Sequence, residues 1–160
     1  MAAVHERLYA SEQMNQIDFA GYAEALLHEL LSSYVGSTGR IAGRVEGSQV
    51  FLEVDQAIPC GLILNELVSN ALKYAFPQGE SGEVVVEVSE SAGLVRFAVC
   101  DSGVRLPEGF GWQSSNSMGL PIVELLVHQI AGELSFLSTP GAAFTVEFPK
   151  QGGKSYAVEA

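Results

Sequence analysis

The spacing of apolar residues changes along the chain and predicts different elements. Between residues 18 and 35 apolar side chains recur at helical spacing and form one apolar face. That face consists of Tyr22, Leu26, Leu27, Leu30, Leu31 and Tyr34. Asp18 is placed to cap this helix at its N-terminus, and the helix should end near Gly36. A second strong helix is predicted over residues 56–76, because Pro77 prevents its continuation.

Shorter segments with strand character follow each other in pairs, joined by turns that contain glycine. The predicted pairs are 40–45 with 49–54, 83–89 with 94–100, and 133–138 with 143–148. A third helix is expected over residues 120–131, with Gly132 as its C′ residue. Because hairpins outnumber βαβ crossovers, the order predicts an α+β two-layer sandwich. Its sheet would be mixed, mainly antiparallel and covered on one face by helices.

The remaining segments set the expected domain boundaries. Residues 2–12 suggest a short helix or the end of a longer one, and residues 15–17 suggest a break. Residues 101–117 have no periodicity, and a loop of that length inside a compact domain is usually functional or disordered. The tail from Lys150 is polar.

Composition limits the classes of function. A chain of 160 residues with 48% hydrophobic residues is long enough for one domain with a substantial core. The formal net charge of -11 repels nucleic-acid phosphates, so no nucleic-acid partner is expected. A single nucleotide remains possible, because backbone N–H groups, one lysine and Mg²⁺ are enough to hold it.

Cysteine usage and hydropathy point to a soluble domain. Cys60 and Cys100 have no metal-binding spacing and should behave as small buried hydrophobic residues. No signal peptide is evident, and no apolar stretch approaches the roughly 20 residues of a membrane span. We therefore expect no direct membrane contact and a cytoplasmic location.

Two constellations of polar residues carry candidate chemistry. Glu66, Asn70 and Lys73 share one face of the second helix, which indicates either a solvated face or a binding site. Asp101 continues the parity of an apolar strand and precedes Gly103. Such a residue is either part of a turn or a carboxylate that accepts a hydrogen bond from an exocyclic amine such as that of adenine.

A glycine at the start of the third helix adds a third feature. Gly119 lets backbone N–H groups approach an anion, and the helix dipole attracts phosphate. Alone, this glycine is equally compatible with a flexible helix entry.

Taken together, the three blocks resemble the N, G1 and G2 boxes of the GHKL (Bergerat-fold) ATPases, especially those of sensor histidine kinases of the HWE type. PCGLILNELVSNALKYAFP resembles the N box, DSGVRLPEGF the G1 box, and SMGLPIVELLVHQIAGEL the G2 box with its helix. GAAFTVEFP resembles the closing strand, and VHERLY the linker after the dimerisation helices. The resemblance implies three regions. Residues 1–14 would be the last part of a dimerisation or linker helix, residues 15–150 an ATP-binding catalytic domain, and residues 151–160 a flexible tail.

The resemblance also implies a role for each matching residue. Asn70 would bind Mg²⁺ and Glu66 would orient the attacking group, so these two are the expected catalytic residues. Lys73 would reach a phosphate, Tyr74 would pack on adenine, and Asp101 beside Gly103 would accept from the adenine amine. The remaining expected nucleotide contacts are Leu106, Met118, Gly119 and Leu120, and residues 104–118 would form a lid over ATP.

The implied activity is transfer of the γ-phosphoryl group of ATP to a histidine on an upstream helix, with a response regulator receiver domain as a further partner. Among the histidines, His5 lies too close to the N-terminus to be presented by a helix, and His28 and His128 suggest surface positions. The isolated chain is therefore expected to bind ATP without phosphorylating itself.

Three departures from the family pattern keep alternatives open. Arg105 replaces a G1-box glycine, Ser117 replaces a G2-box glycine, and Ala142 replaces a threonine before the last strand. They leave room for a degenerate, non-enzymatic interaction module. A serine kinase of the anti-sigma-factor type is the other alternative, because it shares the fold and a similar length.

Overall fold

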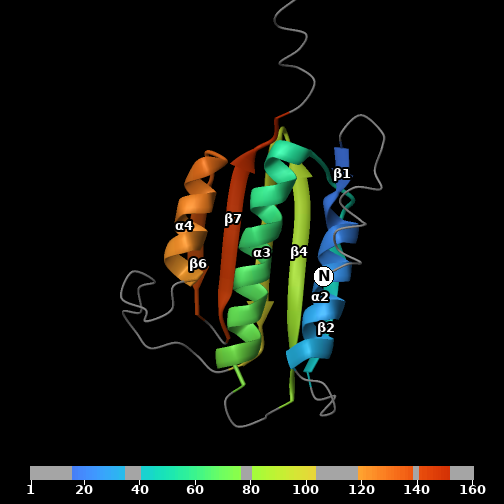
Figure 1. Cartoon of the computed structure of the whole chain (residues 1–160), viewed down its shortest axis with the longest axis vertical. Helices are drawn as coiled ribbons and strands as arrows, with labels where there is room; N and C mark the ends of the chain where they lie inside the picture. Colours follow the sequence, from blue (N-terminus) through green and yellow to red (C-terminus); the bar gives the residue numbers. More distant parts are fainter. Residues whose placement is uncertain (1–15, 35–40, 77–80, 104–118, 139–140, 152–160) are drawn as a thin grey trace, which may run out of the picture.

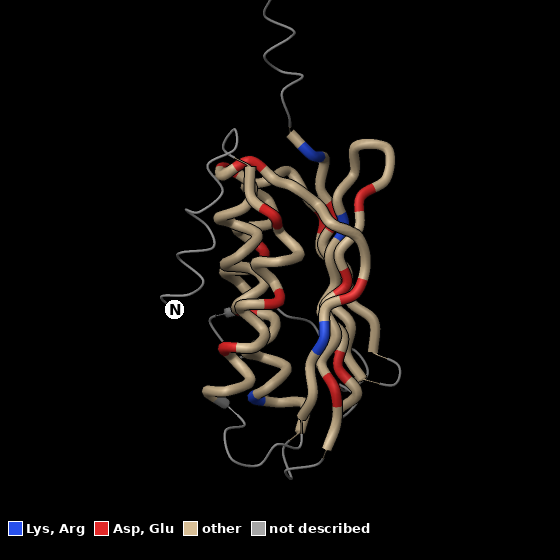
Figure 2. Tube along the Cα trace, turned by 90° about the vertical axis from the view of Figure 1, so that its right-hand side faces the viewer, with Lys and Arg blue, Asp and Glu red and all other residues tan. Residues whose placement is uncertain are grey.

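Three helices of the described residues lie side by side on one face of a mixed five-stranded sheet (Figure 1). They are α2 (Phe19–Tyr34), α3 (Val54–Tyr74) and α4 (Gly119–Gln129). The computed structural model describes residues 16–34, 41–76, 81–103, 119–138 and 141–151. Viewed from the side, the helices form one layer and the sheet forms the other (Figure 2). The predicted two-layer α+β sandwich is confirmed.

The sheet has the strand order β2-β4-β5-β7-β6. These strands are β2 (Ile41–Gly47), β4 (Gly82–Ser91), β5 (Leu94–Asp101), β7 (Ala143–Pro149) and β6 (Glu133–Leu137). β2 runs parallel to β4, and the other neighbours are antiparallel. β1 (Gln16–Asp18) and β3 (Phe51–Glu53) form a separate antiparallel pair.

The predicted hairpin between residues 40–45 and 49–54 is wrong. β2 pairs with β4, whereas β3 pairs with β1 and places Leu52 opposite Ile17. The segment predicted as a break at residues 15–17 overlaps this strand β1. Alternation reports which side chains are buried but not which strand lies alongside, and a three-residue strand is too short for a periodic signal.

The other two hairpins are confirmed. β4 and β5 are joined by Ala92 and Gly93, whose φ angles of 53° and 79° are those of a tight turn that matches strand twist. β6 and β7 also pair directly, with Phe136 opposite Phe144. Residues 139 and 140 of their predicted turn lie outside the described residues.

α4 ends at Gln129, two residues before the predicted end, and its C′ residue lies one position earlier than predicted. Ala131, and not Gly132, has the positive φ (58°) of a C′ residue. Ala131 N–H donates to the His128 carbonyl and Gly132 N–H to the Val127 carbonyl, which together satisfy the last carbonyls of the helix. A glycine is needed at 132 for another reason: a Cβ there would lie 2.8 Å from the Glu147 carbonyl oxygen of β7.

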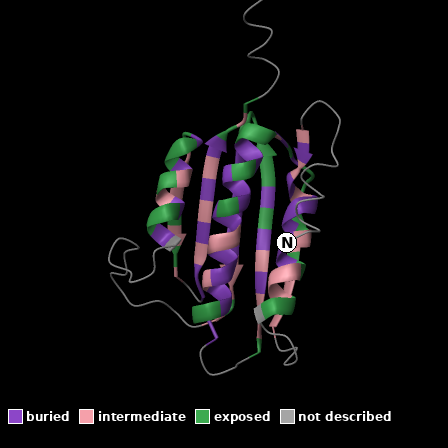
Figure 3. Cartoon of the chain, viewed as in Figure 1, coloured by how far each residue is buried: buried purple, intermediate pink, exposed green. Residues whose placement is uncertain are grey.

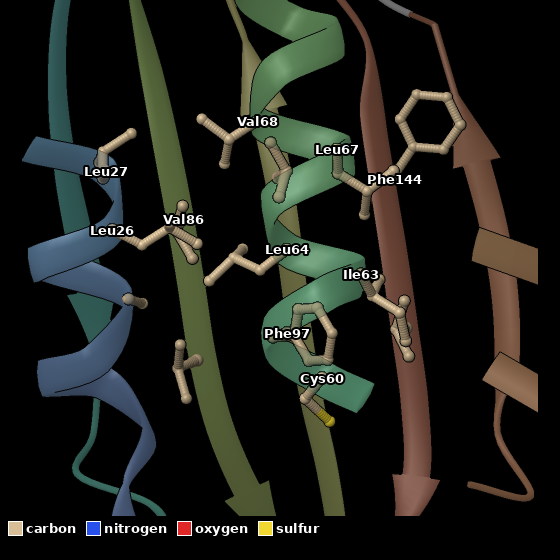
Figure 4. Close-up of a cluster of buried hydrophobic side chains, with 14 of the residues drawn as sticks. Leu26, Leu27, Cys60, Ile63, Leu64, Leu67, Val68, Val86, Phe97 and Phe144 are labelled. Carbon is tan, nitrogen blue, oxygen red and sulfur yellow. The ribbon is translucent and has the colours of Figure 1, made fainter. Parts of the chain in front are cut away.

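The core lies between the helix layer and the sheet, where buried positions alternate with less buried ones along β4 and β7 (Figure 3). α3 contributes Ile63, Leu64 and Leu67 at its centre (Figure 4). The Phe97 ring of β5 lies 5.3 Å from that of Phe19 and 6.4 Å from that of Phe148, between centroids. The predicted cap of α2 is confirmed, because Asp18 Oδ1 accepts from Gly21 N–H at 3.1 Å.

Candidate functional site

The polar residues of α3 lie on the side of the helix that faces away from the core. The opposite side is buried and carries Ile63, Leu64, Leu67, Ala71 and Leu72. Glu66 and Asn70 are half-buried, and Lys73 in the last turn is exposed. The structure therefore keeps the predicted stripe together and leaves it accessible from outside the core.

Asn70 holds a polar atom without a hydrogen-bonding partner. Its Nδ2 is shielded from solvent and has no partner among the described residues. An unsatisfied buried amide costs about 1–3 kcal/mol, and native proteins retain few such groups. The placement is consistent with an amide that a ligand completes from the open side of α3.

Asp101 ends β5 on the side of the sheet that the helices cover, as the alternation predicts. Its Oδ1 accepts from Gly103 N–H at 2.9 Å and from Ala142 N–H at 3.4 Å. Burial raises the pKa of the Asp101 carboxyl above its ordinary value, and the two backbone donors offset part of that rise. The result is a half-buried carboxylate that is held in place by the backbone of two different segments.

Close backbone approaches bring the surrounding segments to the same end of the molecule, the lower end in Figure 1. A Cβ on Gly103 would lie 2.2 Å from the Ala75 carbonyl oxygen just after α3. A Cβ on Gly141 would lie 1.9 Å from the Asp101 carbonyl oxygen. The segment after β5 thus packs against the end of α3 and the segment before β7, which places Asp101 beside the helix end that carries Asn70.

The N-terminus of α4 lies at this same end (Figure 1). Gly119 is the first residue of the helix, and the Leu120 side chain is anchored in the core at 5% exposure. The first backbone N–H groups of a helix have no partner within the helix, and its dipole favours an anion there. The arrangement combines a hydrogen-bond acceptor, an amide and an anion-binding helix end.

Two family models match the chain. The model of histidine kinase-, DNA gyrase B- and HSP90-like ATPases matches residues 55–152, and a histidine kinase model matches residues 1–34. The first match spans more than half of the chain, from the start of α3 to the end of β7. The chain belongs to this ATPase family.

Similar proteins are sensor histidine kinases. PdtaS of Mycobacterium tuberculosis is 35% identical over 130 residues, which cover 79% of this chain and 25% of that protein. Blue-light-activated histidine kinase 2 of Erythrobacter litoralis is 31% identical over 132 residues, which cover 75% of this chain and 38% of that protein. The chain therefore spans about a quarter to two fifths of these relatives.

Solved structures agree with the fold. The histidine kinase domain of a blue-light-activated histidine kinase from E. litoralis superimposes with a TM-score of 0.79 at 25% identity, over 92% of this chain and 70% of that one. The ATP-binding domain of PrrB from M. tuberculosis superimposes with a TM-score of 0.70 at 20% identity, over 86% of this chain and 97% of that one. The family match thus comes from the sequence, and the superpositions independently support the same α+β sandwich.

Several expected features of an ATPase site fall outside the described residues. They are His5, the proposed lid at 104–118, its residues Arg105, Leu106, Ser117 and Met118, and the helix expected within residues 1–14. Tyr74 is described and is 58% exposed, so its ring is open to a ligand. Ala142, the residue in place of threonine, is buried and its N–H donates to Asp101.

Sequence reasoning missed three residues that shape the surroundings of Asp101. Ser102 binds the start of β4 through its hydroxyl and its N–H, and Gly82 and Gly141 permit close packing. A glycine in a polar turn gives no signal that distinguishes a tight contact from ordinary flexibility. These three residues are identified only by their proximity to Asp101 in the folded structure.

The other candidate groups lie away from this end or serve the fold. Cys60 is buried at the start of α3, and burial raises the pKa of its thiol. His28 and His128 are exposed. The described ranges contain no group of three or more His, Cys, Asp or Glu that forms a metal site, and within them no helix has the length and apolar character of a membrane span.

Proposed function

We propose that this chain is the ATP-binding catalytic part of a sensor histidine kinase, which positions ATP and Mg²⁺ for transfer of the γ-phosphoryl group to a histidine. The observation that carries the proposal is the half-buried Asp101 carboxylate, fixed by two backbone donors beside the end of α3. Phosphoryl transfer needs mainly positioning and neutralisation of charge, and this site offers both. The sensor histidine kinases among its relatives support the acceptor class.

Each residue then has a defined task. Asp101 accepts a hydrogen bond from the adenine amine, Gly103 lets the base approach the backbone, and Tyr74 packs against it. Lys73 and the first N–H groups of α4, at Gly119 and Leu120, bind phosphate. Glu66 orients the attacking group, and Leu106 and Met118 add contacts from the two ends of the lid.

Mg²⁺ would be held by Asn70 together with phosphate oxygens. Mg²⁺ typically takes one or two protein ligands and completes its shell with phosphates and water, so a single amide oxygen on α3 suffices. The unpartnered Nδ2 of Asn70 supports a ligand at this position, because the NH₂ group would donate to a phosphate oxygen while the amide oxygen holds the ion. When bound, the ion neutralises charge that develops on the phosphates.

The exposed side of α3 also offers a surface for the phosphoacceptor domain. Ile58 and Leu62 are 48% and 52% exposed and precede Glu66 at four-residue intervals. Leu125 on the neighbouring α4 is 69% exposed. An amphipathic helix that covers these apolar residues brings a histidine on its length to Glu66 and Asn70. A response regulator receiver domain would take the phosphoryl group afterwards.

The domain limits expected from the sequence become part of the same proposal. Residues 15–150 form the catalytic domain, residues 1–14 end the dimerisation region, and residues 151–160 form a tail. The two family matches, to residues 1–34 and then 55–152, support two functional regions along the chain, and the first match extends through α2. A cytoplasmic location of the catalytic domain follows from the kinase role, because the acceptor domain and ATP must share a compartment.

Calorimetric titration of the chain with ATP and Mg²⁺ tests the nucleotide site. We expect a Kd in the micromolar to low-millimolar range, about -8 to -4 kcal/mol. Asp101→Ala should abolish recognition of adenine, and Asn70→Ala should remove the dependence on Mg²⁺. No saturation at millimolar ATP would instead make the chain a non-enzymatic module, and Arg105→Gly would then be the first variant to test.

Phosphotransfer in trans tests the acceptor class and the docking surface. The chain is mixed with a separate phosphoacceptor helical domain and labelled ATP, and the product is treated with acid, which cleaves phosphohistidine but not phosphoserine. Leu62→Ser should slow transfer without weakening ATP binding, whereas Leu137→Ser, at a leucine of β6 that is 63% exposed, should change neither. An acid-stable product would favour the serine kinase.

A further inference from the structure

The strand pairing between β4 and β5 continues for one residue beyond Asp101 in an unusual way. Val84 is opposite Asp101, so Glu83 and Ser102 are the next pair of the antiparallel ladder. Ser102 N–H donates to the Glu83 carbonyl at 3.0 Å, as in a regular ladder. The return bond is made by the side chain, because Glu83 N–H donates to Ser102 Oγ at 2.9 Å.

This substitution releases the backbone at the point where it must turn. In a regular narrow pair the Ser102 carbonyl would accept from Glu83 N–H, and the chain would stay in the sheet. Because the hydroxyl takes that bond, the Ser102 carbonyl is free to turn away while both ladder bonds are kept. The turn then brings Gly103 N–H back to Asp101 Oδ1 at 2.9 Å.

The hydroxyl also lies in a tightly packed position. A Cβ on Gly82 would lie 2.8 Å from Ser102 Oγ and 2.2 Å from the Phe76 ring, so both groups occupy the space that this glycine leaves. Gly103 packs equally closely on the Ala75 carbonyl. The Ser102–Gly103 turn is thus held between β4 and the residues that follow α3.

We propose that Ser102 is a positioning residue that fixes the Asp101 carboxylate for recognition of the adenine amine. It acts through the two-bond contact with Glu83, which sets the turn from which Gly103 N–H reaches Asp101. Ser102 itself contacts no nucleotide. The inference rests on the proposed ATP site and adds a determinant of purine specificity next to it.

A nucleotide-free measurement tests the link between Ser102 and Asp101. In Ser102→Ala, the loosened turn weakens the Gly103 donor, so the pKa of the Asp101 carboxyl measured by carbon-13 NMR should rise. Ser102→Thr keeps the Oγ and should restore the parent value. Ser89→Ala removes a serine hydroxyl on β4, away from this turn, and should leave the pKa of Asp101 unchanged. An unchanged Asp101 titration in a folded Ser102→Ala protein overturns the proposal, whatever the chain binds.

Nucleotide binding supplies the specificity test. We expect Ser102→Ala to weaken ATP binding by roughly three- to tenfold, the loss of about one hydrogen bond. Purine riboside triphosphate lacks the 6-amine that Asp101 would recognise. Ser102→Ala should therefore bind this nucleotide with an affinity within about twofold of that of the parent protein, which is the usual size of the effect of a substitution that removes no contact. Equal weakening for both nucleotides would reduce Ser102 to a structural residue. If the parent binds neither nucleotide, the proposed function fails, and the NMR titration still decides the role of Ser102.

Discussion

Gln56, in the first turns of α3, donates from its buried Nε2 to the Pro149 carbonyl at the end of β7, 93 residues later. The same amide accepts from Gln151 N–H through Oε1 at 3.0 Å. One side-chain amide therefore satisfies a backbone acceptor and a backbone donor, as a neighbouring strand would. This contact ties the start of the central helix to the exit of the last strand, at the end of the molecule opposite Asp101 (Figure 1).

Gln56→Ala should destabilise the fold without touching the nucleotide site. The change leaves the Pro149 carbonyl and the Gln151 N–H without their partner, and each lost bond of this kind costs about 1–3 kcal/mol. Urea unfolding should show a lower midpoint. The affinity for ATP, measured under conditions where the variant is fully folded, should stay the same. The exposed Gln49→Ala is the control, and an equal loss of stability there would contradict this account.

Gly103→Ala should cost both stability and ATP binding. The new methyl would lie 2.2 Å from the Ala75 carbonyl oxygen, and overpacking of this kind costs about 1–3 kcal/mol. Gly93→Ala is a matched control, because its Cβ meets nothing within 4 Å and its penalty comes only from the φ of 79°. Thermal unfolding and calorimetry should therefore separate the two: Gly93→Ala lowers Tm but keeps ATP binding.

Asp101→Asn should increase stability at neutral pH. The folded pKa of Asp101 is raised, so its protonated form is favoured by folding, and the carboxyl reduces stability as pH rises above the ordinary aspartate value of about 4. An asparagine oxygen still accepts from Gly103 N–H but carries no charge. Tm measured from pH 3 to 8 should show the variant gaining on the parent as pH rises, while ATP binding is lost. A gain that is largest at pH 3 would contradict the sign.

Ala142→Ser should tighten ATP binding. Ala142 lies against Asp101, where a hydroxyl would add one hydrogen bond near the adenine, worth about two- to tenfold in affinity. Ala143→Ser changes the next residue, which points to the other face of β7 and should have no effect. Calorimetry on both variants decides, and equal gains at the two positions would show that the effect is not local.

Cysteine reactivity should follow burial. Burial raises the pKa of both thiols, but Cys60 is fully buried on the core-facing side of α3, whereas Cys100 is only half-buried near the end of β5. Alkylation of the native chain at pH 8, followed by mass spectrometry, should label Cys100 slowly and Cys60 only after denaturation. Labelling of Cys60 at the rate of Cys100 would mean that the core opens easily at α3.

The sequence by itself determined the helices, two of the three hairpins and the residue types of the site. Helical periodicity marks the buried face of α3, and the parity of Val95, Phe97 and Val99 places Asp101 on the covered side of the sheet, because both signals are local. The motifs at Asn70, Asp101 and Gly119 were sufficient to indicate the ATPase family. A motif needs only residue identity and order along the chain.

Only the tertiary structure decided which segments lie next to each other. β2 pairs with β4 and not with β3, since strand pairing depends on the whole sheet and not on the alternation within one strand. The same holds for Ser102 and Glu83, and for Gly103 and Ala75, which are distant in sequence and gain their meaning from contact. The chemistry of the site was readable from residue types, but its geometry follows from long-range packing that no local pattern encodes.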